Sequence, residues 1–183
     1  MLLAIALRPS GPGLDTQPQL QQHFRADCPA PPATGVPVSV DILTSIDIDR
    51  PRAQVAAFAG DPSRAPEWYV NIKIVEWQTA PPVALGSQVA FVARFLGRRL
   101  AYTYEVVELV PGERLVMQTA QGPFPMRTEY TWADTPAGGT RMTLRNSGEP
   151  SGFSQLAAPF MAAAMKRANS KDLALLKQVL ERR

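Results

Sequence analysis

Tyrosine hydroxyls are the groups in this sequence best placed to interact with a bound molecule. Tyr102 and Tyr104 alternate along one strand-like segment, and Tyr130 lies in another. A tyrosine hydroxyl can orient a carbonyl or hydroxyl group, whereas a tyrosine that acts as a base needs a strongly lowered pKa. The positions that we expect to face inward include no carboxylate, and residues 38–183 contain no histidine. The sequence therefore supplies hydrogen-bond donors without an evident catalytic base.

Aromatic and methionine side chains accompany these tyrosines on one face of the predicted sheet. Aromatic rings offer flat contact area, and methionines adapt to irregular shapes. We predict that ten positions line a ligand cavity: Trp68, Phe91, Phe95, Tyr102, Tyr104, Met117, Met126, Tyr130, Phe160 and Ala164. The alternative is that these side chains fill the core and leave no space. The opposite face carries charged residues, Arg94 among them, which we interpret as water-facing and structural.

The composition argues against several other chemistries. The 183 residues are 45% hydrophobic and 19% charged, which is typical of a globular protein with a substantial core. The single cysteine, Cys28, allows no intrachain disulfide, and the single histidine, His23, argues against a zinc site or a histidine-based catalytic site. Phosphate-binding glycine loops are absent as well. We therefore expect neither a metal nor a cofactor.

Positive charge is concentrated near the end of the chain. The formal net charge is +3, and from Lys166 onward six basic residues stand against Asp172 and Glu181. We interpret this segment as a solvated helix face, with contact to nucleic acid or an anionic membrane as the alternative, and expect no nucleic-acid partner. No run of about 18 apolar residues occurs, so we predict no transmembrane segment. We expect a cytoplasmic monomer or homodimer.

Residues 1–37 differ in composition from the rest of the chain. They hold seven of the 18 prolines, and each proline removes an amide donor and fixes φ. We expect a disordered extension here and one folded domain over residues 38–183. A secretory signal and a true translation start near Val36 are the alternatives.

Hydrophobic alternation predicts a mainly β domain. The first strand covers residues 38–48, and a short helix follows it, capped by Asp49 with Pro51 in its first turn. Asp61 and Pro62 begin a second short helical turn. Six further strands are predicted, at residues 72–77, 87–96, 100–109, 114–120, 124–133 and 140–146. No helical pattern separates these six strands, so we expect neighbouring strands to be antiparallel.

One long helix is predicted to end the chain, from about residue 152 to residue 181. Pro159 should kink or restart it, and a bent helix can close over a curved sheet. Several alanines follow Pro159. They either leave volume unfilled against the sheet or serve only as good helix formers.

Several motifs together resemble a known superfamily. They are Ile46–Ile48 followed by the helix 49–58, Asp61-Pro62 leading to Glu67-Trp68, the segment 106–115, the segment 138–144, and residues 172–177. In order and spacing, the segment 38–181 is similar to the START/Bet v 1-like superfamily. Within it, the chain resembles the bacterial polyketide cyclase/dehydrase-like branch, often called SRPBCC proteins.

The resemblance implies an α+β helix-grip fold. This fold is a seven-stranded antiparallel sheet wrapped around a long C-terminal helix, with two short helices between the first two strands. It also implies that a hydrophobic small molecule is the partner, because such proteins bind lipids, polyketides or quinone-like compounds between sheet and helix, and a minority are enzymes. We therefore predict ligand binding or transport. A polyketide cyclase/dehydratase-type enzyme, with a loop carboxylate such as Glu67 or Glu76 as base, and a protein-interaction module are the alternatives.

Overall fold

The computed structural model describes residues 39–95, 97–122, 125–149 and 158–182. The expected extension over residues 1–37, and with it the domain boundary at residue 38, lies outside this part of the chain. The described elements come in the following order: β1 (Val40–Ile48), α1 (Arg52–Ala59), the 3₁₀ turn η1 (Pro62–Arg64), α2 (Ala65–Trp68), β2 (Ile72–Trp77), β3 (Gln88–Phe95), β4 (Arg98–Val110), β5 (Arg114–Gln121), β6 (Met126–Asp134), β7 (Thr140–Gly148) and α3 (Ala158–Glu181). All seven predicted strands are present, with ends within two residues of the prediction.

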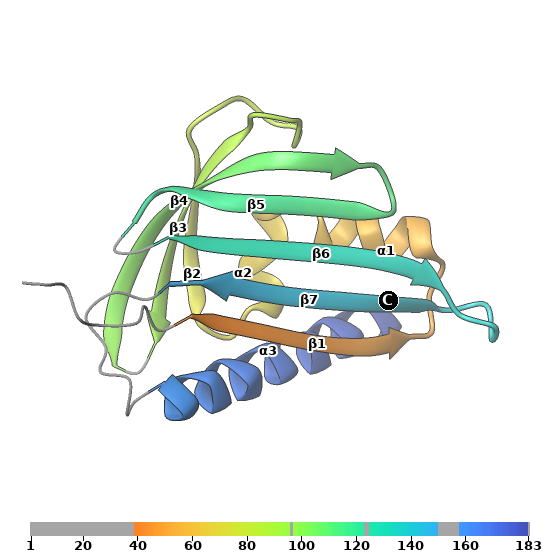
Figure 1. Ribbon diagram of the computed structural model, residues 1–183. Coiled ribbons are helices and arrows are strands. Elements are labelled where there is room, and N and C mark those ends of the chain that lie inside the picture. Colours follow the sequence, from red (N-terminus) through yellow and green to blue (C-terminus); the bar gives the residue numbers. More distant parts are fainter. Residues whose placement is uncertain (1–38, 96, 123–124, 150–157, 183) are drawn as a thin grey trace, which may run out of the picture. The chain divides into compact units, whose positions relative to one another are not determined.

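The strands form one antiparallel sheet in the order β1-β7-β6-β5-β4-β3-β2 (Figure 1). The strands from β2 to β7 follow one another as hairpin neighbours, and turns such as that at Gly112, with a φ of 76°, connect them. Only β1 breaks this order, because it pairs with β7 at the far edge. The segment that carries α1, η1 and α2 therefore has to cross from one edge of the sheet to the other. The predicted helix-grip arrangement is confirmed.

The two short helices begin differently from each other. Asp61 caps η1 as predicted, because its side chain accepts a hydrogen bond from the Ser63 amide at 2.9 Å. The prediction that Asp49 caps α1 is wrong. Pro51 occupies the cap position without a side-chain hydrogen bond, and the Asp49 amide instead donates to Glu181 Oε1 at 2.8 Å. This contact ties the end of β1 to the end of α3.

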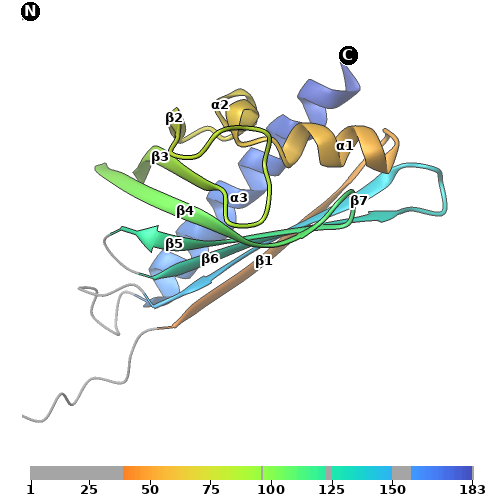
Figure 2. The same ribbon diagram turned by 90° about the horizontal axis from the view of Figure 1, so that it is seen from above.

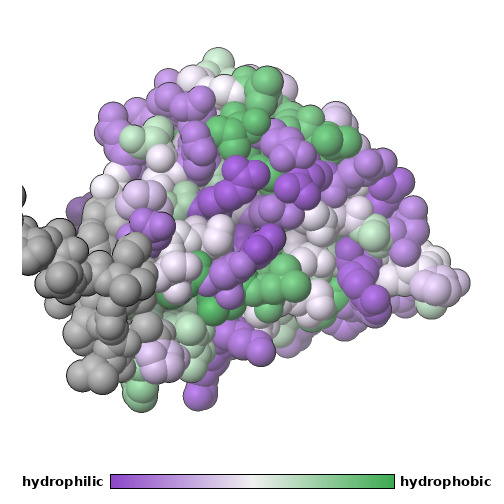
Figure 3. Space-filling model, viewed as in Figure 1, coloured by the Kyte–Doolittle hydropathy of each residue, from purple (hydrophilic) through white to green (hydrophobic). Residues whose placement is uncertain are grey.

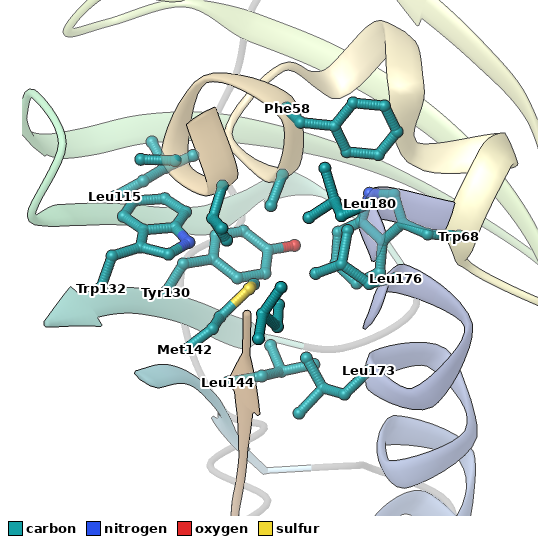
Figure 4. Close-up of a cluster of buried hydrophobic side chains, with 14 of the residues drawn as sticks. Phe58, Trp68, Leu115, Tyr130, Trp132, Met142, Leu144, Leu173, Leu176 and Leu180 are labelled. Atoms are coloured by element: carbon teal, nitrogen blue, oxygen red, sulfur yellow. The ribbon is translucent and has the colours of Figure 1, made fainter. Parts of the chain in front are cut away.

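Helix α3 packs along β1 and against α2 (Figures 1 and 2). Its later turns place Leu173, Leu176 and Leu180 in the hydrophobic core, each at most 1% exposed. Figure 4 shows these leucines beside Trp68 of α2 and the sheet side chains Tyr130, Met142 and Leu144. The predicted beginning of the helix near residue 152 lies outside the described ranges. Pro159 is the second residue of α3 as described, so the predicted kink or restart there concerns chain before Ala158 and stays a prediction.

The outer face of the sheet is held by charge pairs between neighbouring strands. Arg145 of β7 binds Asp41 of β1, and Arg141 binds Asp47 through two hydrogen bonds of 2.7 and 2.8 Å. The hydrogen bond from Arg145 lowers the pKa of Asp41. Figure 3 shows hydrophilic residues across much of this face, interrupted by apolar patches. Because these side chains are about half exposed, we interpret the pairs as structural.

Candidate functional site

A cavity of about 530 Å³ lies between the inner face of the sheet, α2 and the first turns of α3. This volume is within the range of small-molecule sites. Seven of the ten predicted residues line it: Trp68, Phe91, Tyr102, Tyr104, Met117, Met126 and Tyr130. Strand register explains their convergence, because Phe91 pairs with Tyr102 across β3 and β4, and Met117 pairs with Thr128 across β5 and β6.

Three predicted residues stand apart from these seven. The side chain of Phe95 lies outside the described part of the structure. Phe160 is 81% exposed and does not line the cavity, and neither does Ala164. The two predictions place the cavity-facing side chains of α3 one residue too early in the sequence. Met161, Met165 and Ala168 line the cavity instead, because a spacing of four and then three residues keeps them on one helix face.

A buried carboxylate also reaches the cavity, contrary to the sequence-based expectation. Asp172 of α3 is 3% exposed and lines the cavity. Its Oδ1 accepts a hydrogen bond from the Val70 amide at 2.9 Å. Burial raises the pKa of Asp172 from 3.8 to about 6, against the opposing effect of this hydrogen bond. Asp172 lies four residues before Leu176, so helical periodicity places the two residues on the same face of α3. The basic residues around Asp172 instead favoured the interpretation that this face is exposed to solvent.

Three further polar side chains form a connected cluster in the cavity wall. Thr128 Oγ1 donates to Asn146 Oδ1 at 2.8 Å, and Asn146 Nδ2 donates to Asn169 Oδ1 at 3.2 Å. All three residues line the cavity. Asn169 is 6% exposed, and its Nδ2 has no hydrogen-bond partner among the described residues. The cluster links β6, β7 and α3, and leaves one amide donor unused.

The pKa values of the cavity tyrosines are raised, which disfavours a role as bases. The hydroxyls of Tyr69 and Tyr130 lie 2.7 Å apart and share a hydrogen bond. Burial raises the pKa of both above the ordinary value of 10, and it raises the pKa of Tyr104 to about 12. These phenols therefore stay protonated at neutral pH.

The rim of the cavity includes a residue of the β3–β4 hairpin. Arg94, near the end of β3, is exposed and contributes to the lining, and it pairs with Arg99 of β4. On the same hairpin region, the ring of Tyr102 packs over Gly122, where an added Cβ would lie 2.6 Å from the ring. Gly122 therefore leaves space for Tyr102 to lie at the cavity.

A second hollow, of about 930 Å³, lies between α1 and the turns near Pro81 and Pro111. Six of its fifteen lining residues are exposed, Ala53, Ala57 and Pro82 among them. The first cavity is lined mainly by buried and half-buried side chains. We therefore place the candidate site in the first cavity.

The described residues carry no arrangement typical of a metal site. Within them, no group of three or more His, Cys, Asp or Glu side chains is arranged to hold a metal ion. The helices described here are all too short or too polar to cross a membrane.

Comparison with known proteins agrees with this architecture. The chain is similar to a START superfamily protein from Mycobacterium smegmatis, at 11% identity and a TM-score of 0.67, over 78% of this chain and 97% of that one. It is also similar to the Zhui aromatase/cyclase of Streptomyces sp. R1128, at 16% identity and a TM-score of 0.66, over 79% and 95% of the two chains. A protein from Thermus thermophilus gives 17% identity and a TM-score of 0.68, over 76% and 96%. At these identities the likeness shows the fold.

No curated protein matches the sequence. The family model described as polyketide cyclase / dehydrase and lipid transport, however, matches residues 39–181. This match covers all the described strands and helices and confirms the resemblance inferred from the sequence motifs. The chain belongs to the polyketide cyclase / dehydrase and lipid transport family.

Proposed function

We propose that this protein binds and carries a small, mostly hydrophobic molecule in the cavity between the sheet and α3. The observation that supports this proposal is the cavity itself, about 530 Å³ in volume and walled by aromatic and methionine side chains. Native interiors seldom leave voids of this size unfilled, because each missing contact forfeits dispersion energy. A cavity lined by rings and flexible thioethers therefore suits an apolar ligand of modest size.

The proposal can be tested with a neutral fluorescent dye. N-phenylnaphthylamine should bind saturably, one dye per chain, with a rise in fluorescence. Replacing Ala168, which lines the cavity, by Phe should fill space and weaken binding at least tenfold. Ala174→Phe adds the same ring at an exposed position of the same helix and should leave binding unchanged. Equal binding to both variants, or no saturable binding to the parent protein, would contradict the proposal.

Asp172 specifically favours a second candidate function, proton transfer on a carbonyl compound as in a cyclase or dehydratase. Such chemistry needs a base that removes a proton from the carbon next to the carbonyl. Burial brings the pKa of Asp172 to about 6, which makes it a stronger base than an exposed aspartate. The carboxylate would take the proton from carbon and return it to the same carbon or to a neighbouring oxygen.

Isotope exchange distinguishes this enzyme from a carrier. In deuterium oxide, the parent protein should accelerate deuterium uptake at the carbon next to the carbonyl of tetralone. Asp172→Asn should reduce the acceleration by about 100-fold or more, because the amide cannot accept the proton. If the parent protein gives no acceleration over buffer although tetralone binds, the enzyme candidate is rejected and the carrier remains.

A further inference from the structure

An exposed stripe on the first half of α3 runs beside the residues that line the cavity. Phe160, Arg167 and Lys171 are spaced seven and four residues apart, which places them on one side of the helix. Phe160 is 81% exposed, and the two basic side chains are exposed as well. Each of the three directly precedes a residue that lines the cavity. These three residues, the α3 stripe, therefore border the cavity without lining it.

The β3–β4 hairpin borders the same cavity and is also basic. Arg94 and Arg99 are exposed and lie directly opposite each other across the two strands. Like charges in this arrangement destabilise a sheet, and an anion bound between them relieves the repulsion. Figures 1 and 2 show the turn of this hairpin at the same end of the sheet as the beginning of α3. Arg94 and Met161, one from each segment, both line the cavity. The cavity is therefore flanked by basic residues on two elements.

The four basic residues of these two segments are not neutralised locally. Within the described part of the chain, none of them forms an ion pair. Six other arginines do lie within 4.0 Å of a carboxylate oxygen: Arg52, Arg64, Arg114, Arg127, Arg141 and Arg145. Residues 88–104 and 158–171 contain no Asp or Glu. Glu76 and Glu149 are exposed on other strands, so the unpaired positive charge is local to the two segments.

The chemistry of this surface fits an anionic lipid bilayer better than it fits nucleic acid. Each Lys or Arg near an anionic bilayer strengthens binding about fivefold. An exposed phenylalanine adds to this when its ring enters the boundary between headgroups and acyl chains. A nucleic-acid duplex keeps its bases stacked inside and offers the ring no apolar layer. The helix dipole does not account for Arg167, which lies in the middle of α3 rather than in its last turn.

We propose that the protein docks on a bilayer that contains anionic phospholipids, through the α3 stripe and the Arg94–Arg99 pair. Phe160 enters the boundary between headgroups and acyl chains, and the four basic side chains contact headgroup phosphates. This inference rests on the proposed function, because it supplies the surface from which an apolar ligand reaches the cavity without passing through water. The docking is peripheral, since it uses one side of a helix and the end of a hairpin.

Co-sedimentation with lipid vesicles measures this docking directly. The full chain should bind vesicles of equal parts phosphatidylcholine and phosphatidylglycerol at least about tenfold more tightly than vesicles of phosphatidylcholine alone. Raising the ionic strength from about 0.1 M to about 1 M shortens the Debye length from about 10 Å to about 3 Å and should remove most of this preference. Equal binding to the two kinds of vesicle at low ionic strength overturns the inference.

Matched variants assign the docking to the α3 stripe. Arg167→Glu should weaken binding to the anionic vesicles at least about fivefold, the effect of one basic residue at an anionic surface. Arg182→Glu makes the same charge change at an exposed position about 22 Å further along the chain, beyond the Debye length, and should leave binding within about twofold. Phe160→Ser leaves the net charge unchanged and should weaken binding about fivefold. Circular dichroism confirms that each variant is folded.

The outcomes separate this inference from the proposed function. Equal losses in Arg167→Glu and Arg182→Glu, or full binding by Phe160→Ser, overturn the docking surface while dye binding in the cavity stands. Tighter binding to an oligonucleotide than to anionic vesicles, unaffected by Phe160→Ser, also overturns it. If the parent protein fails to bind N-phenylnaphthylamine in the absence of vesicles, the proposed function fails. The bilayer is then no source of a ligand, and the inference fails with it.

Discussion

The two halves of α3 lie along the same sheet but pack in different ways. In the later half, Leu173, Leu176 and Leu180 are at most 1% exposed and belong to one continuous core with α1, α2 and the sheet (Figure 4). In the earlier half, Met161 and Met165 border a cavity, together with small and polar residues. One helix therefore anchors the fold at one end and walls a cavity at the other.

The difference shows which half of α3 contributes most to stability and which half the proposed ligand would contact. Branched leucines in fixed rotamers fill a core closely, so the later half contributes packing energy. Methionine and alanine on the earlier half leave space, and Asn169 has an unpaired buried amide nitrogen, so this half contributes less to stability. We expect substitutions in the two halves to separate these properties.

Leu176→Ala should give the largest loss of stability. Leu176 is 0% exposed within the main core cluster. Truncation removes its transfer energy and leaves a void, so the free energy of unfolding should fall by about 2–5 kcal/mol. Urea or guanidinium unfolding followed by circular dichroism measures this change.

Met165→Ala is the matched truncation in the cavity half. Its side chain already lacks packing partners on the cavity side, so the same measurement should show a loss of only about 1 kcal/mol. Dye binding should weaken in this variant and be retained by folded Leu176→Ala. Equal losses of stability in the two variants would mean that the cavity half is packed as tightly as the core.

Asp172→Asn should stabilise the protein in a pH-dependent way. The folded state raises the pKa of Asp172 from 3.8 to about 6, so the folded protein disfavours the ionised carboxylate by at most about 3 kcal/mol. This penalty is absent near pH 3, below both pKa values, where both states hold the proton. It grows as the pH rises from about 3.8 to about 6 and is complete above that. The variant should therefore match the parent near pH 3 and exceed its unfolding free energy by up to about 3 kcal/mol at pH 8.

Asp41→Asn is a control whose effect on the unfolding free energy should have the opposite sign to that of Asp172→Asn. The Arg145 side chain lowers the pKa of Asp41, so this carboxylate stabilises the fold above the unfolded pKa and loses that effect as pH falls. Asp41→Asn should be less stable than the parent at pH 8, and the difference should shrink toward low pH. If both variants were less stable than the parent at pH 8, the assigned burial of Asp172 would be refuted.

The sheet was predictable because each strand carries its own evidence. Alternation and glycine or proline turns define the strands from local sequence, and antiparallel pairing follows when no helix intervenes. The cap of α1 was not predictable in the same way, because the Asp49 amide is engaged by Glu181 from the other end of the domain. That contact depends on tertiary structure, which no local pattern encodes.

The site was predictable on the sheet and less so on α3. Period-two alternation placed Tyr102, Tyr104 and Tyr130 on the inner face, and the same alternation through Met142 and Leu144 extends to Asn146. On α3 the polar residues were missed because hydrophobicity alone was used to choose the inward stripe. The phase of the buried leucines, continued backwards by four and seven residues, reaches Asp172 and Asn169.

Phe160→Ser tests that helical phase and should have the smallest effect. Phe160 is 81% exposed and borders neither the core cluster nor the cavity, so the unfolding free energy should change by no more than about 0.5 kcal/mol. Dye affinity should also stay within about twofold, because no cavity contact is removed. A polar substitution at Met161, one residue later and 4% exposed, should instead reduce both stability and binding. The reverse result would show that the inward face of α3 begins at Phe160, so that the helix is rotated relative to the sheet and the cavity is differently lined.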